Sequence, residues 1–259
     1  MLHLGAVTYE VLKDWDLETI IRNLEAAGFA AVELRTGHGH GVEPSLDSAE
    51  RDRVRKRFEN SKVRLLSLGS TCEFHSPEAD VRQHNVAVGK QFVDLAHDAG
   101  AWGVKVRPNG FPKNVPRDVT IGRIGAALRE LGDYGAGRGI EIWLEVHGNG
   151  TQFPSVAADV MRATRHKSVG LCWNSNPPDV VNGSVKQSWD LLRPWVRNAH
   201  ISELADPQYP WRELFALMQQ SGYDRYTLCE ARETREPERF LRWYKALWTE
   251  LTRPCARAD

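Results

Sequence analysis

The sequence predicts one closed (β/α)8 barrel, the α/β fold known as a TIM barrel, and three observations support this prediction. Short apolar segments alternate with longer amphipathic segments from end to end, which is typical of strand–helix units around a parallel sheet. Eight such units fit into the 259 residues, close to the roughly 250 residues of a one-domain barrel. No linker or low-complexity tract divides the chain. We therefore expect one domain over residues 1–252 and a C-terminal tail over 253–259, with a doubly wound open sheet as the alternative.

The expected strands are short apolar runs. They cover residues 2–7, 31–35, 63–68, 103–107, 140–146, 169–173, 196–201 and 226–230. In the fifth run, a period of two puts Glu145 and His147 on one face, and Ile142 and Leu144 on the other. We expect the apolar face to pack against helices, so that Glu145 points into the barrel.

The intervening helices show apolar residues at helical spacing together with start and stop signals. In the first, Asp16 is the candidate N-cap and Gly28 the residue that ends the helix. A later helix begins near Pro210 and closes at Gly222. The other helices are expected over residues 49–58, 85–99, 120–138, 155–164, 184–192 and 237–251.

Composition and missing motifs exclude several classes of protein. Lys plus Arg and Asp plus Glu both number 34, so no net positive charge attracts nucleic acid or an anionic membrane. No apolar run approaches the roughly 18 residues of a membrane span. The chain lacks a signal-peptide pattern, a Gly-x-Gly-x-x-Gly turn, a P-loop, a Gly-x-Ser-x-Gly elbow and a His-Glu-x-x-His helix. We expect a cytoplasmic protein with a small-molecule substrate and no nucleic acid or membrane partner.

Polar residues stand where the expected strands end. Glu145, Asn174, His200 and Glu230 follow this pattern in the last four strands, and all offer atoms that bind divalent metals. Barrels of this kind have their active site at the C-terminal ends of the strands. A wider set shares the position: Glu33, Arg35, Glu73, His75, Lys105, Arg107, Asn109, His147, Asn176, Glu203 and Arg232.

An internal salt-bridge network is the structural alternative to a site. In such a network, Glu145 and Glu230 would be neutralised by Lys105, Arg107, Arg35 or Arg232, and Lys105 and Arg107 share the inward parity of Glu145. Desolvating each buried charge costs several kcal/mol, however, and hydrophobic replacements are often as stable. So many inward charges favour a working site. We expect Lys105 and Arg107 to balance the carboxylates and also to hold an anionic or polyhydroxy ligand.

Four motifs resemble the xylose isomerase-like barrel superfamily, and the resemblance spans nearly the whole chain. They are Leu-Glu-Val-His-Gly (144–148), Cys-Trp-Asn-Ser-Asn (172–176), Asn-Ala-His-Ile-Ser-Glu (198–203) and Cys-Glu (229–230). The superfamily includes sugar isomerases, ketose 3-epimerases, dehydratases and endonuclease IV-type repair enzymes. Its members are often dimers or tetramers. The resemblance implies an enzyme that acts on a small carbohydrate or keto acid, and it is compatible with a homo-oligomer.

The resemblance also implies a metal site. In epimerase-like members, one divalent ion is held by Glu, Asp, His and Glu from strands five to eight, which map onto Glu145, Asn174, His200 and Glu230. Asn174 departs from this pattern, because it offers a carbonyl oxygen but no charge. We therefore expect Mn, Mg, Co or Zn to bind more weakly, unless His147 compensates, and a metal-free site is the alternative.

The implied chemistry is proton abstraction next to a carbonyl, as in a sugar, sugar-acid or keto-polyol isomerase or epimerase. The ion would stabilise the developing negative charge, and Glu145 and Glu230 would remove and return the proton. The residues expected to bind substrate are His147, Lys105, Arg107, Asn176, His75, Glu203 and Arg232.

Three other functions stay open at this point. The same arrangement can expel a β-hydroxyl group, as in a dehydratase. A non-catalytic sugar-binding barrel would keep the pocket after Asn174 replaced a charged ligand. An endonuclease IV-like enzyme is disfavoured, because neither further metal ligands nor a cationic face is evident. The loop Gly37–Gly41, with His38 and His40, is either a lid over the substrate or a solvated glycine-rich segment.

Overall fold

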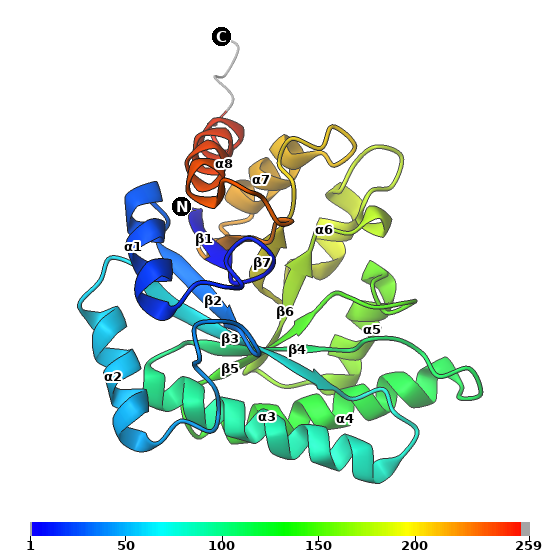
Figure 1. Cartoon of the computed structure of the whole chain (residues 1–259). Coiled ribbons are helices and arrows are strands. Elements are labelled where there is room, and N and C mark those ends of the chain that lie inside the picture. The colour runs from blue at the N-terminus through cyan, green and yellow to red at the C-terminus, as the bar shows by residue number, and fades with distance from the viewer. Residues whose placement is uncertain (1, 255–259) are drawn as a thin grey trace.

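Parallel strands form a closed barrel, and each strand is followed by a helix on the outside (Figure 1). The computed structural model describes residues 2–254. The strands are β1 (His3–Val7), β2 (Ala31–Arg35), β3 (Arg64–Glu73), β4 (Gly103–Arg107), β5 (Glu141–Glu145), β6 (Val169–Asn174), β7 (Val196–Ile201) and β8 (Tyr226–Cys229). Because β1 pairs with both β2 and β8, the predicted single (β/α)8 barrel is confirmed and the open sheet is excluded.

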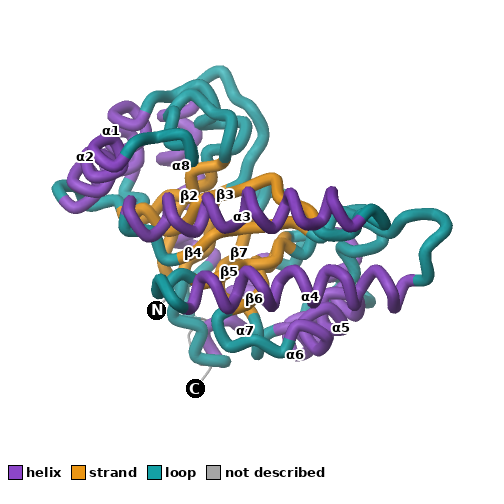
Figure 2. The backbone as a smooth tube through the Cα atoms, turned by 90° about the horizontal axis from the view of Figure 1, so that it is seen from below, coloured by secondary structure: helices purple, strands orange, loops and turns teal. Residues whose placement is uncertain are grey.

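The helices cover the outer face of the barrel. They are α1 (Leu17–Ala27), α2 (Ser48–Glu59), α3 (Ala79–Ala99), α4 (Arg117–Ala136), α5 (Pro154–Thr164), α6 (Lys186–Leu192), α7 (Trp211–Gln220) and α8 (Pro237–Leu251), with a short 3₁₀ helix η1 (Pro177–Asp179). The two long helices α3 and α4 lie side by side (Figure 2). No helix within residues 2–254 combines the length and hydrophobicity that crossing a bilayer requires. The expected tail over 253–259 lies outside the described residues from position 255 onward.

Alternation along the strands separates the barrel interior from the layer beneath the helices. On β5, Ile142 and Leu144 belong to the large core between strands and helices. Trp143, which points the other way, belongs to a small apolar cluster inside the barrel. That cluster consists of Val7, Ala31, Leu66, Trp143, Cys172 and Leu228. Glu145 lies on the same face of β5 as Trp143, so its carboxylate also points into the barrel, above this apolar cluster.

Several element ends follow the predicted signals, and two differ from the predicted position by five residues or more. Asp16 accepts a hydrogen bond from the Thr19 backbone N–H at 2.8 Å, and Gly28 ends α1 with a φ of 76°, which glycine adopts readily. Helix α3 starts at Ala79 rather than at residue 85, and no side chain caps it. Strand β3 continues to Glu73 rather than ending at 68, because Gly69 and Glu73 both pair with β4 across an irregular stretch that shows no apolar alternation.

The N-terminal end of the barrel is closed by ion-paired and aromatic side chains. Arg225 donates from Nη1 and Nη2 to the two oxygens of Glu141, at 2.7 and 3.0 Å. Trp143 Nε1 donates to Glu141 Oε2 at 2.7 Å. This end is therefore filled, and open space in the barrel remains at the opposite, C-terminal end.

Candidate metal centre and active site

The C-terminal ends of the strands surround a polar cavity of about 300 Å³. In barrels of this kind, that end holds the active site. The cavity is lined by Tyr9, Arg35, Lys105, Arg107, Glu145, His147, Asn174, Asn176 and Glu230. Closure of the barrel thus brings residues from both ends of the chain into one site.

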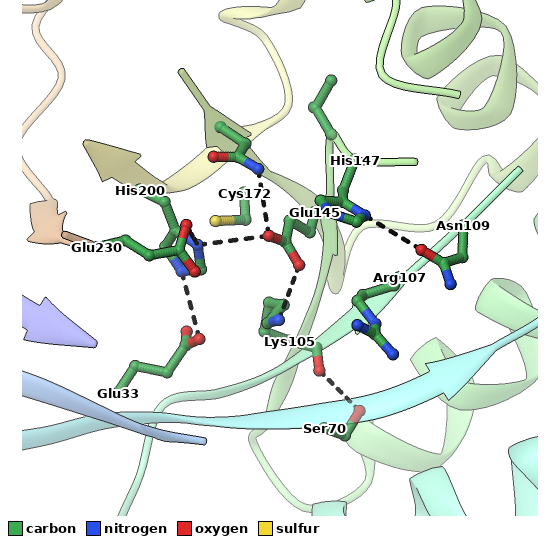
Figure 3. A network of polar contacts seen from close by, with 12 residues as sticks. Glu33, Ser70, Lys105, Arg107, Asn109, Glu145, His147, Cys172, His200 and Glu230 are labelled. Carbon is green, nitrogen blue, oxygen red and sulfur yellow. Dashed lines mark hydrogen bonds and ion pairs between the residues drawn. The ribbon is translucent and has the colours of Figure 1, made fainter. Parts of the chain in front are cut away.

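His200 on β7 lies beneath this cavity and faces two carboxylates (Figure 3). Its Nδ1 is 3.4 Å from Glu230 Oε2 and 3.7 Å from Glu145 Oε1. Ligand atoms of the three residues all lie within 4.8 Å of one another. Nδ1 is buried, yet no hydrogen bond from the described part of the chain satisfies it. One nitrogen and two carboxylates that converge in this way suit a divalent cation.

Glu33 supports His200 from the other side of the imidazole ring. Its Oε1 is 3.3 Å from His200 Nε2, and its Oε2 accepts a hydrogen bond from Ser67 Oγ at 2.8 Å. Both Glu33 and His200 are fully buried. A metal-binding imidazole usually places its second nitrogen against a carboxylate or carbonyl, which fixes the ring. Glu33 is placed to provide that support.

The surrounding acidic groups favour the charged form of His200 when no cation is bound. Burial alone lowers the pKa of the imidazole, but Cys172, Glu230 and Glu33 together raise it well above its ordinary value. Burial raises the pKa of the Cys172 thiol to about 11, so at neutral pH the two carboxylates are the effective partners. A cation bound at Nδ1 would replace this proton.

Lys105 forms a buried ion pair with Glu145. Its Nζ donates to Glu145 Oε2 at 2.8 Å, and both side chains are only 4% exposed. Burial opposes ionisation of Glu145, but Lys105 and His200 outweigh it and hold the pKa of this carboxyl well below its usual range. The Asn174 amide nitrogen donates to Glu145 Oε1 at 3.3 Å. The predicted ion pairing therefore exists for Glu145, whereas no Lys or Arg within residues 2–254 pairs with Glu230.

A second polar chain runs along the edge of the cavity. Arg107 Nη2 donates to Glu73 Oε1 at 2.8 Å, and Asn109 Nδ2 donates to the same oxygen at 2.5 Å. His147 Nδ1 lies 3.2 Å from Asn109 Oδ1. Because an amide oxygen only accepts, His147 Nδ1 is the donor. Arg107 thus balances Glu73, not Glu145 or Glu230.

The donor set fits a divalent cation with one adjustment. Glu145, His200 and Glu230 supply atoms that already converge, and the unsatisfied His200 Nδ1 is accounted for by a ligand there. Asn174 turns its amide nitrogen, not its oxygen, toward Glu145. Its Oδ1 would become a ligand only after rotation of the amide group. These residues are the ones that would hold Mn, Mg, Co or Zn.

The cavity collects most of the residues predicted from the sequence. Lys105, Arg107, Glu145, His147, Asn174, Asn176 and Glu230 line it, and His200 lies beneath it. Three predicted substrate contacts do not line it. His75 lies 3.9 Å from Glu73, Glu203 accepts from the Arg232 backbone N–H at 3.4 Å, and Arg232 itself is exposed.

The sequence assigned no role to Glu33 or Tyr9, and it offered Arg35 only as a possible partner of Glu145 or Glu230, with which Arg35 forms no ion pair in the described chain. Glu33 and Arg35 belong to the strand-end set, and their inward parity on β2 was a usable signal. The partner of Glu33, His200, lies on the far side of the barrel, so its function emerges only from the closed fold. Tyr9 lies just beyond β1 in a bend, where the strand period no longer sets the direction of a side chain.

Comparison with known proteins agrees with this fold. The family profile described as xylose isomerase-like TIM barrel matches residues 21–176. A sequence search of curated proteins finds no match.

Solved structures similar to the chain include several sugar epimerases. An L-ribulose 3-epimerase has a TM-score of 0.83 at 16% identity, covering 100% of both chains. A D-psicose 3-epimerase from Clostridium cellulolyticum H10, solved with D-tagatose, has a TM-score of 0.82 at 12% identity, covering 97% of this chain and 100% of that one. The IOLI protein, solved with a zinc atom, has a TM-score of 0.79 at 15% identity, covering 96% of each. At these identities the likeness establishes a shared fold.

Proposed function

Because the chain belongs to the xylose isomerase-like TIM barrel family, we propose that it is a divalent-metal-dependent epimerase or isomerase of a small keto sugar. The observation that supports this most strongly is the convergence of Glu145, His200 and Glu230 within 4.8 Å beneath a polar cavity. When bound there, a divalent ion would act as a Lewis acid toward the substrate carbonyl. A substrate of monosaccharide size suits the cavity, whose volume of about 300 Å³ is at the lower end of ligand sites.

Glu145 and Glu230 are the proposed proton-transfer pair, and their surroundings differ. Lys105 keeps Glu145 ionised, so this carboxylate is ready to accept a proton from the carbon next to the carbonyl. Glu230 has no Lys or Arg partner within the described residues and is 19% exposed, and we assign to it the return of the proton to the substrate. General acid–base catalysis of this kind contributes about 10² to 10⁴-fold in rate.

The other polar residues of the cavity orient the substrate. Lys105 and Arg107 present donors to its oxygens, and the imidazole of His147 also lines the cavity and offers a ring nitrogen to the substrate. Asn176 lines the cavity, but its amide nitrogen already donates to the Val146 and Asn174 carbonyl oxygens. Its role is therefore to fix the end of β6 beside Glu145.

The test is deuterium uptake from deuterated water. Ketoses, hydroxypyruvate, inososes and sugar acids are incubated with the protein and Mn, Mg, Co or Zn, and mass spectrometry follows exchange at the carbon next to the carbonyl. We expect exchange with at least one substrate, and Glu145→Gln and Glu230→Gln should each lower its rate by about 10² to 10⁴-fold. Glu141→Gln, which changes the same strand at the filled end, is the matched control and should keep the exchange rate.

Other outcomes would favour the other functions. Loss of water from a substrate would identify a dehydratase on the same site. Binding of a sugar without exchange or dehydration, with any of the four metals, would favour a non-catalytic sugar-binding barrel.

A further inference from the structure

Arg35 differs from every other cation around the cavity. Lys105 pairs with Glu145 at 2.8 Å, and Arg107 pairs with Glu73 at the same distance. The half-buried Arg35 also lines the cavity, but no carboxylate of residues 2–254 lies within ion-pair distance of its guanidinium group. Its nearest polar contact is a neutral one, His38 Nε2 at 3.0 Å from Nη1. A partly desolvated charge without a counter-charge is costly unless a ligand supplies one.

The loop after β2 holds Arg35 in place from two sides. Arg35 Nη1 donates to His38 Nε2, so that ring nitrogen carries no proton. Burial and the adjacent guanidinium group both lower the pKa of His38. His40 Nδ1 accepts from the Val42 backbone N–H at 3.0 Å, so its Nε2 donates to the Arg35 carbonyl oxygen at 2.8 Å. Neither imidazole lines the cavity. The two histidines of the glycine-rich loop thus position Arg35.

Arg107 offers a second guanidinium group to the same space. Only its Nη2 donates to Glu73, and its Nε is buried with no hydrogen-bond partner in the described chain. Between β2 and β4, strand β3 contributes Gly69, which pairs in register with Arg35. A Cβ atom at Gly69 would lie 2.9 Å from Glu33 Oε1 and 3.3 Å from Arg35 Cα. The glycine therefore leaves the room that the Glu33 carboxylate and the Arg35 backbone occupy, so a larger residue there would displace Arg35.

We propose that this cavity selects a keto sugar that carries a carboxylate, with Arg35 as the principal counter-charge and Arg107 as a second donor. The inference rests on the proposed function and narrows its substrate class to keto-sugar acids. One uncompensated cation calls for one negative charge, and a guanidinium group binds a carboxylate through parallel hydrogen bonds. A phosphate dianion would place excess negative charge beside Glu145 and Glu230. By contrast, D-psicose and L-ribulose, after which two similar structures are named, are neutral.

The test compares sugars that differ only in this charge. D-Fructose is paired with D-fructuronate, and D-tagatose with D-tagaturonate, since in each pair a carboxylate replaces the terminal hydroxymethyl group. Calorimetric titration of the full chain with Mn present should give at least about tenfold tighter binding for the acid of one pair. In Arg35→Met the two members should bind within about threefold of each other, and Arg35→Lys should retain part of the preference. Arg53→Met, at an exposed arginine of α2, removes the same charge outside the cavity and should keep the full preference.

The outcomes separate this inference from the proposed function. Equal or tighter binding of the neutral ketose by the unmodified protein overturns the carboxylate assignment, and that result needs no variant to fold. Tighter binding of D-fructose 6-phosphate than of either acid overturns it in favour of a phosphate ester. Acid preference that depends on Arg35, without deuterium exchange, supports the anion site while contradicting the epimerase proposal. Deuterium exchange on a neutral ketose, with no preference for binding acids, supports the epimerase proposal and contradicts the anion site.

Discussion

Two carboxylates on one strand show what distinguishes a structural ion pair from a working site. Glu141 and Glu145 begin and end β5 and share its inward face. At the N-terminal end, both oxygens of Glu141 accept hydrogen bonds from Arg225 and Trp143. At the C-terminal end, Lys105 bonds to one oxygen of Glu145, while buried atoms of the neighbouring His200 and Glu33 have no hydrogen-bond partner within residues 2–254. A buried charge alone therefore does not indicate function, whereas incomplete satisfaction of several buried polar atoms does.

The two ends of the barrel should differ most in the free energy of unfolding that is lost when the cation at each end is removed. Lys105→Met removes the closest cation of Glu145 from a site that is 4% exposed, and breaking such a buried pair costs about 3–5 kcal/mol. Arg225→Met breaks a pair whose side chains are 27% and 30% exposed, so solvent screening limits the cost to about 1 kcal/mol. Urea unfolding of both variants without added metal measures the free energy of unfolding. Equal costs at the two ends would contradict the comparison.

The sequence predicted the layout of the site better than its connections. Period-two alternation on β5 was enough to turn Glu145 inward, and the recurrence of polar strand ends located Asn174, His200 and Glu230. The sequence could not show that Glu33 contacts His200, because that contact depends on closure of the barrel. It could not show which cation pairs with which carboxylate, because Lys105 and Arg107 have the same parity. The directions of His75, Glu203 and Arg232 depend on loop geometry, which a strand period does not specify.

Asp179 extends the comparison to a carboxylate with no cation. Its Oδ2 accepts hydrogen bonds from the Asn176 backbone N–H at 2.8 Å and from Tyr209 Oη at 3.0 Å, while Oδ1 has no partner in the described chain. Burial raises its pKa from 3.8 to about 7. The folded state therefore holds the proton at pH values where the unfolded state has lost it, so this contribution to stability falls as pH rises toward and through 7.

We predict that Asp179→Asn removes this pH dependence. Between pH 6 and 8, a folded-state pKa of about 7 implies that the unmodified protein loses about 1.4 kcal/mol of its free energy of unfolding. Asn is always neutral and keeps an oxygen that accepts both hydrogen bonds. Urea unfolding at the two pH values, with the difference between variant and unmodified protein as the readout, cancels the other titrating groups. A difference that does not change with pH would show that Asp179 is ionised in the fold.

An effect of similar size is expected on the affinity for Mn at position 174, where the C-terminal end lacks a charge. Asn174→Asp places a third carboxylate near Glu145 and His200 and should tighten Mn binding by about tenfold, which corresponds to about 1.4 kcal/mol. Without metal, the same change should destabilise the fold, because it replaces the hydrogen bond from Asn174 to Glu145 by repulsion. Calorimetric titration and urea unfolding give the two readouts. Unchanged or weaker Mn affinity would mean that residue 174 is not a ligand.

The most direct test of a metal site at the C-terminal end is calorimetric titration of the chelator-treated protein with Mn. We predict one bound ion per chain, and loss of binding in His200→Ala and in the Glu145→Gln, Glu230→Gln double variant. Glu141→Gln, at the filled end of the same strand, should bind Mn like the unmodified protein. Absence of binding at millimolar Mn, or equal binding by the His200→Ala variant, would contradict the assignment of Glu145, His200 and Glu230 as the metal ligands.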